Sequence, residues 1–373
     1  MPVPAIRPPI NREDHPMTTP PASSAGLAVD RLLRPDVVGP RIAEATGEAA
    51  WTDFSAELIA GGKSNLTFTL RSDAGELILR RPPTGELLPS AHDMGREARI
   101  QLGLASTDVP VAGIVLNETT GEDLGVPYYV MEKVVGHVIR DALPPGYAET
   151  DDDKAAMADA QIDAMVALHA VDQDAVGLGD LGRPEGYLER QLRRWLGQSE
   201  KASERVRADR LPELAARLGQ DLPTSPSSRI IHGDYRMDNC VVDADDPGRI
   251  KAILDWELST LGDPVADLAQ TVLYWGDPDG PEVPLIPSLT TGPGWPGPQR
   301  LLDRYCSATG TDPAHMPWYL AFATFKFAAI AQGVATRSEA GDMAGQDFGD
   351  IGPQIRELVE YGHSILDSRK GTR

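Results

Sequence analysis

The segment HGDYRMDN, residues 232–239, decides the fold of this chain. It follows the apolar residues 229–231. The turn sequence DADDPG, residues 243–248, separates two further apolar segments, 239–242 and 250–254. Apolar runs separated by Asp, Pro and Gly predict a β-hairpin. A short strand, a polar loop and a hairpin are therefore expected in this order.

The polar residues of this region have the spacing that phosphoryl transfer requires. Asp234 lies two residues after a histidine, Asn239 follows five residues later, and Asp255 ends the last apolar segment. Such a reaction uses one carboxylate to accept the proton of a hydroxyl group, and hard oxygen ligands to hold Mg²⁺. Each residue alone could be an ordinary turn residue, and His232 a core histidine. The combined pattern favours a catalytic site made of Asp234, Asn239 and Asp255, with Asn239 and Asp255 as metal ligands.

The rest of the chain divides into a β-rich part and a helical part. Strands are predicted at residues 54–60, 66–71, 76–81, 113–118 and 127–134. One helix, starting from the capping pattern between Ser90 and Asp93, is predicted to run to Leu104. After Gly136 the apolar spacing becomes helical, at residues 153–171, 187–196, 211–218 and 318–330. The fold class is therefore α+β, with the hairpin embedded among helices.

Composition excludes several classes of partner. The chain has 373 residues, with 35 basic and 56 acidic side chains and a formal net charge of −21. A nucleic-acid-binding protein needs a basic surface, so nucleic acid is not expected to be a partner of this chain. No apolar run has the length of a signal peptide or of a membrane span, so no membrane partner is expected. Two cysteines cannot form a disulfide framework, which favours a cytoplasmic location. The oligomeric state does not follow from the sequence.

Taken together, the motifs resemble the aminoglycoside phosphotransferase/choline kinase family. The resemblance rests on HGD-x₄-N at 232–239 with ILDWE at 253–257, and it covers roughly residues 45–360. The closest subgroup consists of the kinase-like domains that are fused to acyl-CoA dehydrogenases. Its marks are G-x-SNLT at 62–67, LRRPP at 79–83, GDP-x-x-DLA at 262–269, and YLAF at 319–322 running to Gln332-Gly333.

This resemblance implies a bilobal protein-kinase-like fold and a function. The five strands and one helix would form an antiparallel, nucleotide-binding N-lobe at residues 26–133, after a disordered tail at 1–25. Residues 134–373 would form the catalytic and substrate-binding C-lobe. The implied activity moves the γ-phosphoryl group of ATP, with GTP as the alternative nucleotide, through Mg²⁺ to a hydroxyl of a small molecule. Asp234 would be the catalytic base.

The resemblance also assigns residues to the nucleotide site. The loop over the phosphates would contain Gly61, Gly62, Ser64 and Asn65, and the hinge near the adenine would contain Met131, Glu132 and Val134. Arg80 stands where protein kinases have a lysine, with Arg81 as the alternative if the strand register slips by one. Arginine keeps the charge and can hold phosphate with two hydrogen bonds. Glu97, on the following helix, is the expected ion-pair partner.

The acceptor is less defined. Substrate contacts are predicted for Arg236, Trp256, Tyr274 and Trp275, beside the Pro/Gly-rich loop 276–298. Acidic runs usually form solvated surfaces, so the net charge does not establish a pocket for a cationic acceptor. The subgroup resemblance suggests hydroxyacyl-CoA-type acceptors instead, with a cluster of arginines on one predicted helix as weak candidates for their phosphates: Arg190, Arg193 and Arg194. A third alternative, motivated by Arg80, is a non-catalytic pseudokinase that senses nucleotide. Asp263 is expected to begin a helix whose Asp267 braces the catalytic loop.

Overall fold

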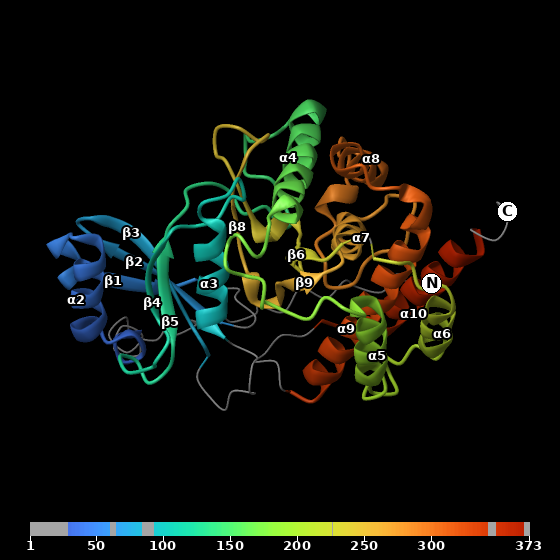
Figure 1. Ribbon diagram of the computed structural model, residues 1–373, viewed down its shortest axis with the longest axis horizontal. Coiled ribbons are helices and arrows are strands. Elements are labelled where there is room, and N and C mark those ends of the chain that lie inside the picture. Colours follow the sequence, from blue (N-terminus) through green and yellow to red (C-terminus); the bar gives the residue numbers. More distant parts are fainter. Residues whose placement is uncertain (1–28, 60–64, 84–92, 226, 342–347, 369–373) are drawn as a thin grey trace, which may run out of the picture.

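The structure is a computed structural model that describes residues 29–59, 65–83, 93–225, 227–341 and 348–368. The predicted tail at residues 1–25 lies outside these ranges. Figure 1 shows a sheet with helices α2 (Pro35–Thr46) and α3 (Met94–Leu104) at one end, and a larger helical body at the other. This is the α+β, protein-kinase-like arrangement that the sequence predicts.

The sheet of the N-lobe has five strands in the order β1-β2-β3-β5-β4, and each neighbouring pair is antiparallel. Its strands are β1 (Ser55–Leu58), β2 (Leu66–Ser72), β3 (Gly75–Arg81), β4 (Ile114–Glu118) and β5 (Tyr128–Glu132). All five lie within or next to the predicted ranges. Helix α3 begins at Met94 because the side chain of Asp93 accepts a hydrogen bond from the backbone N–H of Arg96 at 2.9 Å.

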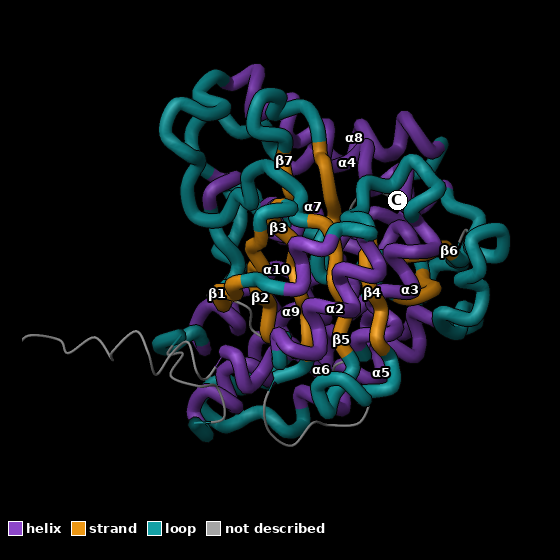
Figure 2. Tube along the Cα trace, turned by 90° about the vertical axis from the view of Figure 1, so that its left-hand side faces the viewer, coloured by secondary structure: helices purple, strands orange, loops and turns teal. Residues whose placement is uncertain are grey.

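Both faces of this sheet are buried, and the residues alternate between them. Leu77 and Leu79 pack with α2, whereas Ile78 packs with Met94 of α3. Successive side chains of a strand point to opposite faces, so Arg80 lies on the same face as Ile78, toward α3. The antiparallel register places Arg80 opposite Tyr129. Strands β3 and β5 are neighbours in the sheet (Figure 2), so Arg80 near the end of β3 lies beside the strand that leads into the hinge.

The C-lobe is built from helices around one apolar core. Its helices are α4 (Asp151–Ala170), α5 (Tyr187–Ser199), α6 (Leu211–Gln220), α7 (Pro264–Trp275), α8 (Pro298–Thr309), α9 (Met316–Glu339) and α10 (Gly352–Ser368). Helix α4 begins two residues before the predicted start, because Thr150 and Asp153 form a capping box. Helix α9 is central, packing against α5, α6, α7 and α10. Within the described ranges, no helix combines the length and apolarity needed to cross a bilayer.

Two small antiparallel pairs carry the sequence motifs at residues 232–239 and 253–257. The predicted hairpin is confirmed as β7 (Cys240–Val242) paired with β8 (Ile250–Ile253). The predicted strand β6 (Arg229–Ile231) pairs with β9 (Thr260–Gly262), which the sequence reading missed. Backbone hydrogen bonds also join the hairpin to the segment that follows the N-lobe. His137, just after the hinge, exchanges two backbone hydrogen bonds of 2.8 Å with Val242.

Candidate active site

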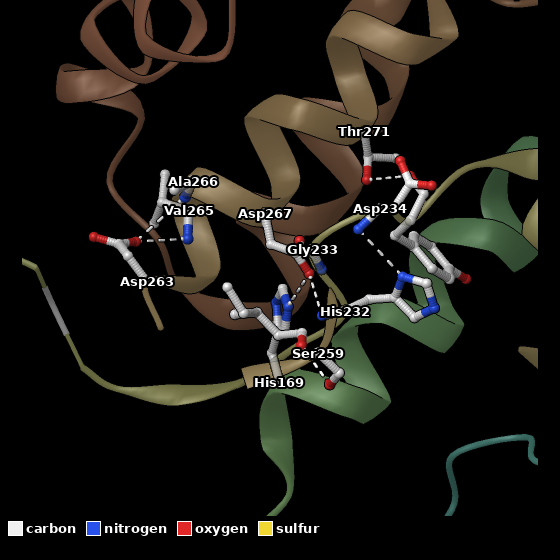
Figure 3. A network of polar contacts seen from close by, with 12 residues as sticks. His169, His232, Gly233, Asp234, Ser259, Asp263, Val265, Ala266, Asp267 and Thr271 are labelled. Carbon is white, nitrogen blue, oxygen red and sulfur yellow. Dashed lines mark hydrogen bonds and ion pairs between the residues drawn. The ribbon is translucent and has the colours of Figure 1, made fainter. Parts of the chain in front are cut away.

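The catalytic loop begins with a glycine whose conformation other residues rarely adopt. Gly233 has φ +85°, and a Cβ at this position would lie 2.8 Å from the carbonyl oxygen of Leu258. The turn at Gly233 (Figure 3) follows β6, and Asp234 after it is partly exposed, whereas His232 and Gly233 are buried. A side chain at position 233 would therefore displace either the loop or the segment of Leu258.

The side chain of Asp267 in α7 fixes the backbone of this loop. Its Oδ2 accepts a hydrogen bond from the backbone N–H of His232, and its Oδ1 accepts one from that of Gly233, both at 2.9 Å. On its other side, Asp267 lies 3.3 Å from Nε2 of His169. Burial alone would raise the pKa of Asp267, but His169 and His232 outweigh it and lower that pKa. The buried side chain is therefore an anion that fixes two loop N–H groups.

Replacing Asp267 with asparagine is expected to destabilise the fold by about 3–5 kcal/mol, the cost of removing one partner from a buried charged network. Asparagine has one acceptor oxygen, so one of the two loop N–H groups loses its partner. Urea unfolding at neutral pH measures the effect. Asp312→Asn is a matched control, because that carboxylate also accepts a backbone N–H bond, at 2.9 Å, but in an exposed turn. Equal stability of Asp267→Asn and wild type would contradict this role.

His232 connects the loop to the strand that ends in Asp255. Its Nε2 lies 2.9 Å from the carbonyl oxygen of Leu254, and its Nδ1 accepts a hydrogen bond from the N–H of Asp234 at 3.3 Å. The ring is fully buried and packs between Tyr235 and Trp256. Trp256 is only 1% exposed, and its Nε1 donates to the carbonyl of Ile253. The structure therefore places Trp256 in the core rather than among the groups that face the cleft.

Asp234 and Asn239 are in direct contact. The amide Nδ2 of Asn239 donates to the backbone oxygen of Asp234 at 2.8 Å and to its Oδ2 at 3.2 Å. The guanidinium of Arg236 lies 3.5 Å from the same Oδ2 and 3.2 Å from a carboxylate oxygen of Asp238. Burial, and then the charge of Asp234, raise the pKa of Tyr274. Asp234 is thus surrounded by polar groups, with its side chain 25% exposed.

Asp255 faces the N-lobe and contacts the cation on β3. Its backbone is left-handed, with φ 66°, and its Oδ1 accepts a hydrogen bond from Arg80 at 3.0 Å. Arg80 also lies 3.4 Å from Oε2 of Glu97. Burial opposes the charge of this guanidinium, but the surrounding groups Tyr129, Glu97 and Asp255 outweigh it and raise its pKa. The expected pair of Arg80 and Glu97 is therefore present, and the strand register needs no shift to Arg81.

A cleft of about 890 Å³ lies between the sheet and the hairpin. Its lining joins the hinge to the motif residues: Ile78, Arg80, Met131, Glu132, Val134, Asn239, Val241, Leu254 and Asp255. Apolar side chains and the polar groups of Arg80, Asn239 and Asp255 share this lining. A partly apolar cleft of this size with a few convergent polar groups suits a nucleotide.

The residues predicted for the loop over the phosphates are described only in part. Gly61, Gly62 and Ser64 lie outside the described residues. Asn65 is buried, and its amide donates to Oε1 of Glu97 at 3.0 Å. Asn65 therefore holds the partner of Arg80 in place.

The structure also adds residues that the sequence reading missed. Arg140 lines the cleft, and it also lines a small side cavity together with Arg236, Tyr274 and Trp275. Ile286, from the Pro/Gly-rich loop, borders both spaces. An exposed arginine in an irregular segment has no periodicity, so no sequence signal marks Arg140.

The donor atoms fit Mg²⁺. The amide of Asn239 is oriented by its contacts with Asp234, and no described residue donates a hydrogen bond to its Oδ1. Asp255 uses Oδ1 for Arg80, and no described residue donates to its Oδ2. Two hard oxygen ligands that complete their shell with water and phosphate oxygens are a usual protein site for this ion. Asn239 and Asp255 are therefore the residues that would hold it.

Comparisons with known proteins agree with this geometry. Acyl-CoA dehydrogenase family member 11 of Rattus norvegicus is 34% identical over 307 residues, which cover 81% of this chain and 39% of the relative. The chain thus spans about two fifths of the length of this curated relative. A Ralstonia eutropha protein whose name assigns it to the aminoglycoside phosphotransferases is 32% identical. Its structure matches with a TM-score of 0.70 and covers 85% of this chain and 93% of that one.

A more distant structure shares the fold. The GDP and kanamycin complex of an aminoglycoside phosphotransferase is 16% identical, with a TM-score of 0.55, and covers 86% of this chain and 94% of that one. The model of the phosphotransferase enzyme family matches residues 55–306, which include the sheet, the cleft and both catalytic motifs. The chain belongs to the phosphotransferase enzyme family.

Proposed function

We propose that this protein is a magnesium-dependent kinase that moves the γ-phosphoryl group of ATP to a hydroxyl of a small molecule. One observation carries the proposal. Asn239 and Asp255, from a loop and a strand end that are separate in sequence, both line the nucleotide-sized cleft, and the amide of Asn239 donates a hydrogen bond of 3.2 Å to Oδ2 of Asp234. Phosphoryl transfer depends mainly on such positioning and on charge stabilisation.

Each residue has a role that its contacts permit. Asp234 would accept the proton of the acceptor hydroxyl, because its carboxylate is partly exposed and its backbone is fixed by Asn239 and His232. Bound Mg²⁺ would neutralise charge on the phosphate oxygens. Arg80 would hold a phosphate group while it keeps its ion pair with Glu97. Met131, Glu132 and Val134 would border the nucleotide base.

Two other functions remain candidates, each with its own observation. The relative named acyl-CoA dehydrogenase family member 11 favours a hydroxyacyl-CoA-type acceptor, although the chain spans only two fifths of that protein. The ion pair between Arg80 and Asp255 favours a non-catalytic nucleotide sensor, because it occupies one oxygen of a metal ligand. The same cleft would bind nucleotide in all three cases. The three functions are therefore distinguished by whether a phosphorylated product forms and by what that product is.

Thermal unfolding in the presence of nucleotide tests the proposal at its first step. We expect Mg²⁺-ATP to raise the melting temperature, and ATP with excess EDTA to give a much smaller rise, because Asn239 and Asp255 bind the nucleotide through the metal. GTP forms a parallel arm, since a structure of the same fold holds GDP. Equal stabilisation with and without Mg²⁺ would contradict the assignment of the two ligands.

A transfer screen tests the second step. Aminoglycosides, choline-type amino alcohols and hydroxyacyl-CoAs are incubated with Mg²⁺-ATP, and the phosphorylated product is detected by mass. A product from any arm supports a kinase and identifies its acceptor class. Nucleotide binding without product or ATP consumption in any arm would favour the sensor.

A cytoplasmic location is also part of the proposal. Both cysteines are free thiols, as expected in a reducing compartment.

A further inference from the structure

A cavity in the C-lobe lies apart from the nucleotide cleft. Its volume is about 480 Å³, and it is bordered by the ends of α4, α7 and α8, by β6 and by the start of α9. Figure 1 shows α4, α7 and α8 in the helical body, away from the sheet. None of the described residues that line this cavity also lines the cleft. A space of this size can hold a small organic molecule.

One side chain in the lining is a cation without a partner. Arg229 of β6 is partly buried, and within the described ranges no oxygen accepts a hydrogen bond from its guanidinium. The chain has 21 more acidic than basic side chains, so a shortage of carboxylates does not explain an unpaired arginine. A guanidinium is a planar group that can hold a carboxylate with two parallel hydrogen bonds. Arg229 therefore offers the cavity a binding group for an anion.

The other side chains of the lining restrict the kind of anion. Asp312 is exposed, and its Oδ1 accepts the backbone N–H of Ala314 at 2.9 Å. In the part of the chain that the structure describes, no ion pair joins Asp312 to Arg229, so Asp312 would repel a second negative charge on the ligand. The lining also has an apolar part, formed by Val166, Ala170, Val265 and Ala308. It thus fits a molecule with one carboxylate and an apolar body.

Two buried residues of the lining connect the cavity to the catalytic loop. Tyr305 is 2% exposed, and its hydroxyl oxygen lies 2.7 Å from Nδ1 of His169. Nε2 of the same histidine lies 3.3 Å from Oδ2 of Asp267. The carboxylate of Asp267 accepts the backbone N–H groups of His232 and Gly233 (Figure 3). Three side chains therefore link the cavity to the two residues that precede the proposed base.

The direction of these hydrogen bonds follows from the groups that make them. The carboxylate of Asp267 is an anion and can only accept, so Nε2 of His169 carries a proton. Burial raises the pKa of Tyr305, so its hydroxyl keeps its proton and can donate it to Nδ1 of His169. A ligand that packs against Tyr305 and His169 would restrict both rings. It would thereby also oppose the opening of the hydrogen bonds between Asp267 and the loop.

We propose that this cavity is a second small-molecule site, which binds an organic monocarboxylate through Arg229 and stabilises the catalytic loop through Tyr305, His169 and Asp267. The site goes beyond the proposed function, because its ligand is neither the nucleotide nor the acceptor. Binding at the site does not rest on the kinase assignment. Only the consequence of binding for phosphoryl transfer rests on it, since the loop carries the proposed base.

Two probes of similar size and opposite charge test the site. Benzoate and benzylamine are titrated calorimetrically into protein that is saturated with Mg²⁺ and a non-hydrolysable ATP analogue, which keeps both probes out of the nucleotide cleft. We expect saturable binding of benzoate to wild type and no saturation by benzylamine. Arg229→Gln should weaken benzoate binding by about 10-fold or more, the loss of a hydrogen bond between charged groups.

Matched variants separate a specific site from general charge and from misfolding. Arg249→Gln removes the same charge from an exposed side chain in the turn between β7 and β8, outside the cavity, and should bind benzoate like wild type. Arg229→Lys keeps the cation and should bind benzoate more tightly than Arg229→Gln does. The site is refuted if benzoate does not saturate wild type, if benzylamine binds more tightly than benzoate, or if Arg229→Gln and Arg249→Gln have equal affinities for benzoate.

Hydrogen exchange of a peptide that contains residues 232–234, followed by mass spectrometry, measures the connection to the loop. Benzoate at about ten times its Kd should slow the exchange of the His232 and Gly233 N–H groups by up to about 10-fold, because opening then requires its release. Tyr305→Phe keeps the ring but removes the hydroxyl that reaches His169. This variant should bind benzoate and lose the slowing. Binding without slowing in wild type, or slowing that persists in Tyr305→Phe, would refute the connection.

Failure of this inference is distinguishable from failure of the proposed function. Each variant is first titrated with the Mg²⁺-bound analogue alone. Wild type that binds no analogue would refute the kinase assignment, while its titration with benzoate would still test the second site. Normal binding of the analogue without saturation by benzoate would refute only the second site.

Discussion

Replacing Asp234 with alanine is expected to lower the rate of phosphoryl transfer by about 10²–10⁴-fold, the usual contribution of a positioned general base. The loop should keep its shape, because Asp267 and His232 hold it through backbone atoms that the substitution leaves in place. The acceptor would still bind, but its hydroxyl would lack a group to receive the proton. The loss should therefore appear in kcat rather than in KM.

The measurement is the steady-state rate with the acceptor found in the transfer screen, alongside the melting temperature of each variant. Asp245→Ala is the matched control: it removes a carboxylate from the turn of the same hairpin, where the side chain is exposed. The control should turn over at the wild-type rate. An Asp234→Ala enzyme with wild-type kcat would remove Asp234 from the catalytic machinery.

Replacing Asp255 with asparagine is expected to abolish saturable binding of Mg²⁺-ATP in the millimolar range. Asparagine tolerates the left-handed backbone at this position, so the change removes charge with little strain. The chain would then offer the metal only neutral amide oxygens, from Asn239 and from the substituted side chain, and no carboxylate. Arg80 would keep Glu97 as its partner but lose Asp255 as its second anion.

Titration of Mg²⁺ at fixed ATP, followed by thermal shift, measures this effect. Metal-free ATP should stabilise Asp255→Asn and wild type to a similar, small extent, because both keep Arg80 and the apolar cleft. Asp245→Ala again serves as the control and should titrate like wild type. A wild-type Mg²⁺ dependence in Asp255→Asn would show that another side chain binds the metal.

The sequence predicted the elements whose signals are local. The strands of the N-lobe and the hairpin of residues 239–254 follow from apolar segments and turn residues that are adjacent in the chain. Strand β9 was missed because it has three residues, ends in glycine, and exists only through pairing with β6 about thirty residues earlier. The β-propensity of these three residues alone is insufficient to predict a strand.

The site shows the same division. The spacing of Asp234, Asn239 and Asp255 is a local signal, and the fold gathers the elements that carry them. Trp256 is adjacent to the motif, yet its ring is buried against His232, and adjacency in sequence does not say which way a ring points. The hydrogen bond from Lys326 of α9 to the carbonyl oxygen of Gly233 spans 93 residues of chain, which no periodicity predicts.

The exchange of backbone hydrogen bonds between His137 and Val242 has a mechanical consequence. It joins the segment that follows the hinge to the strand that follows Asn239. The two backbones are in close contact, because a Cβ at Gly136 would collide with the carbonyl oxygen of Val242. A second bond, from the N–H of Ile253 to the carbonyl of Pro110, fastens the other hairpin strand. Backbone hydrogen bonds thus join the hinge side of the cleft to the hairpin that lies between Asn239 and Asp255. We therefore expect any opening of the cleft to move the other strands of the sheet and to leave the distance between the hinge and this hairpin unchanged.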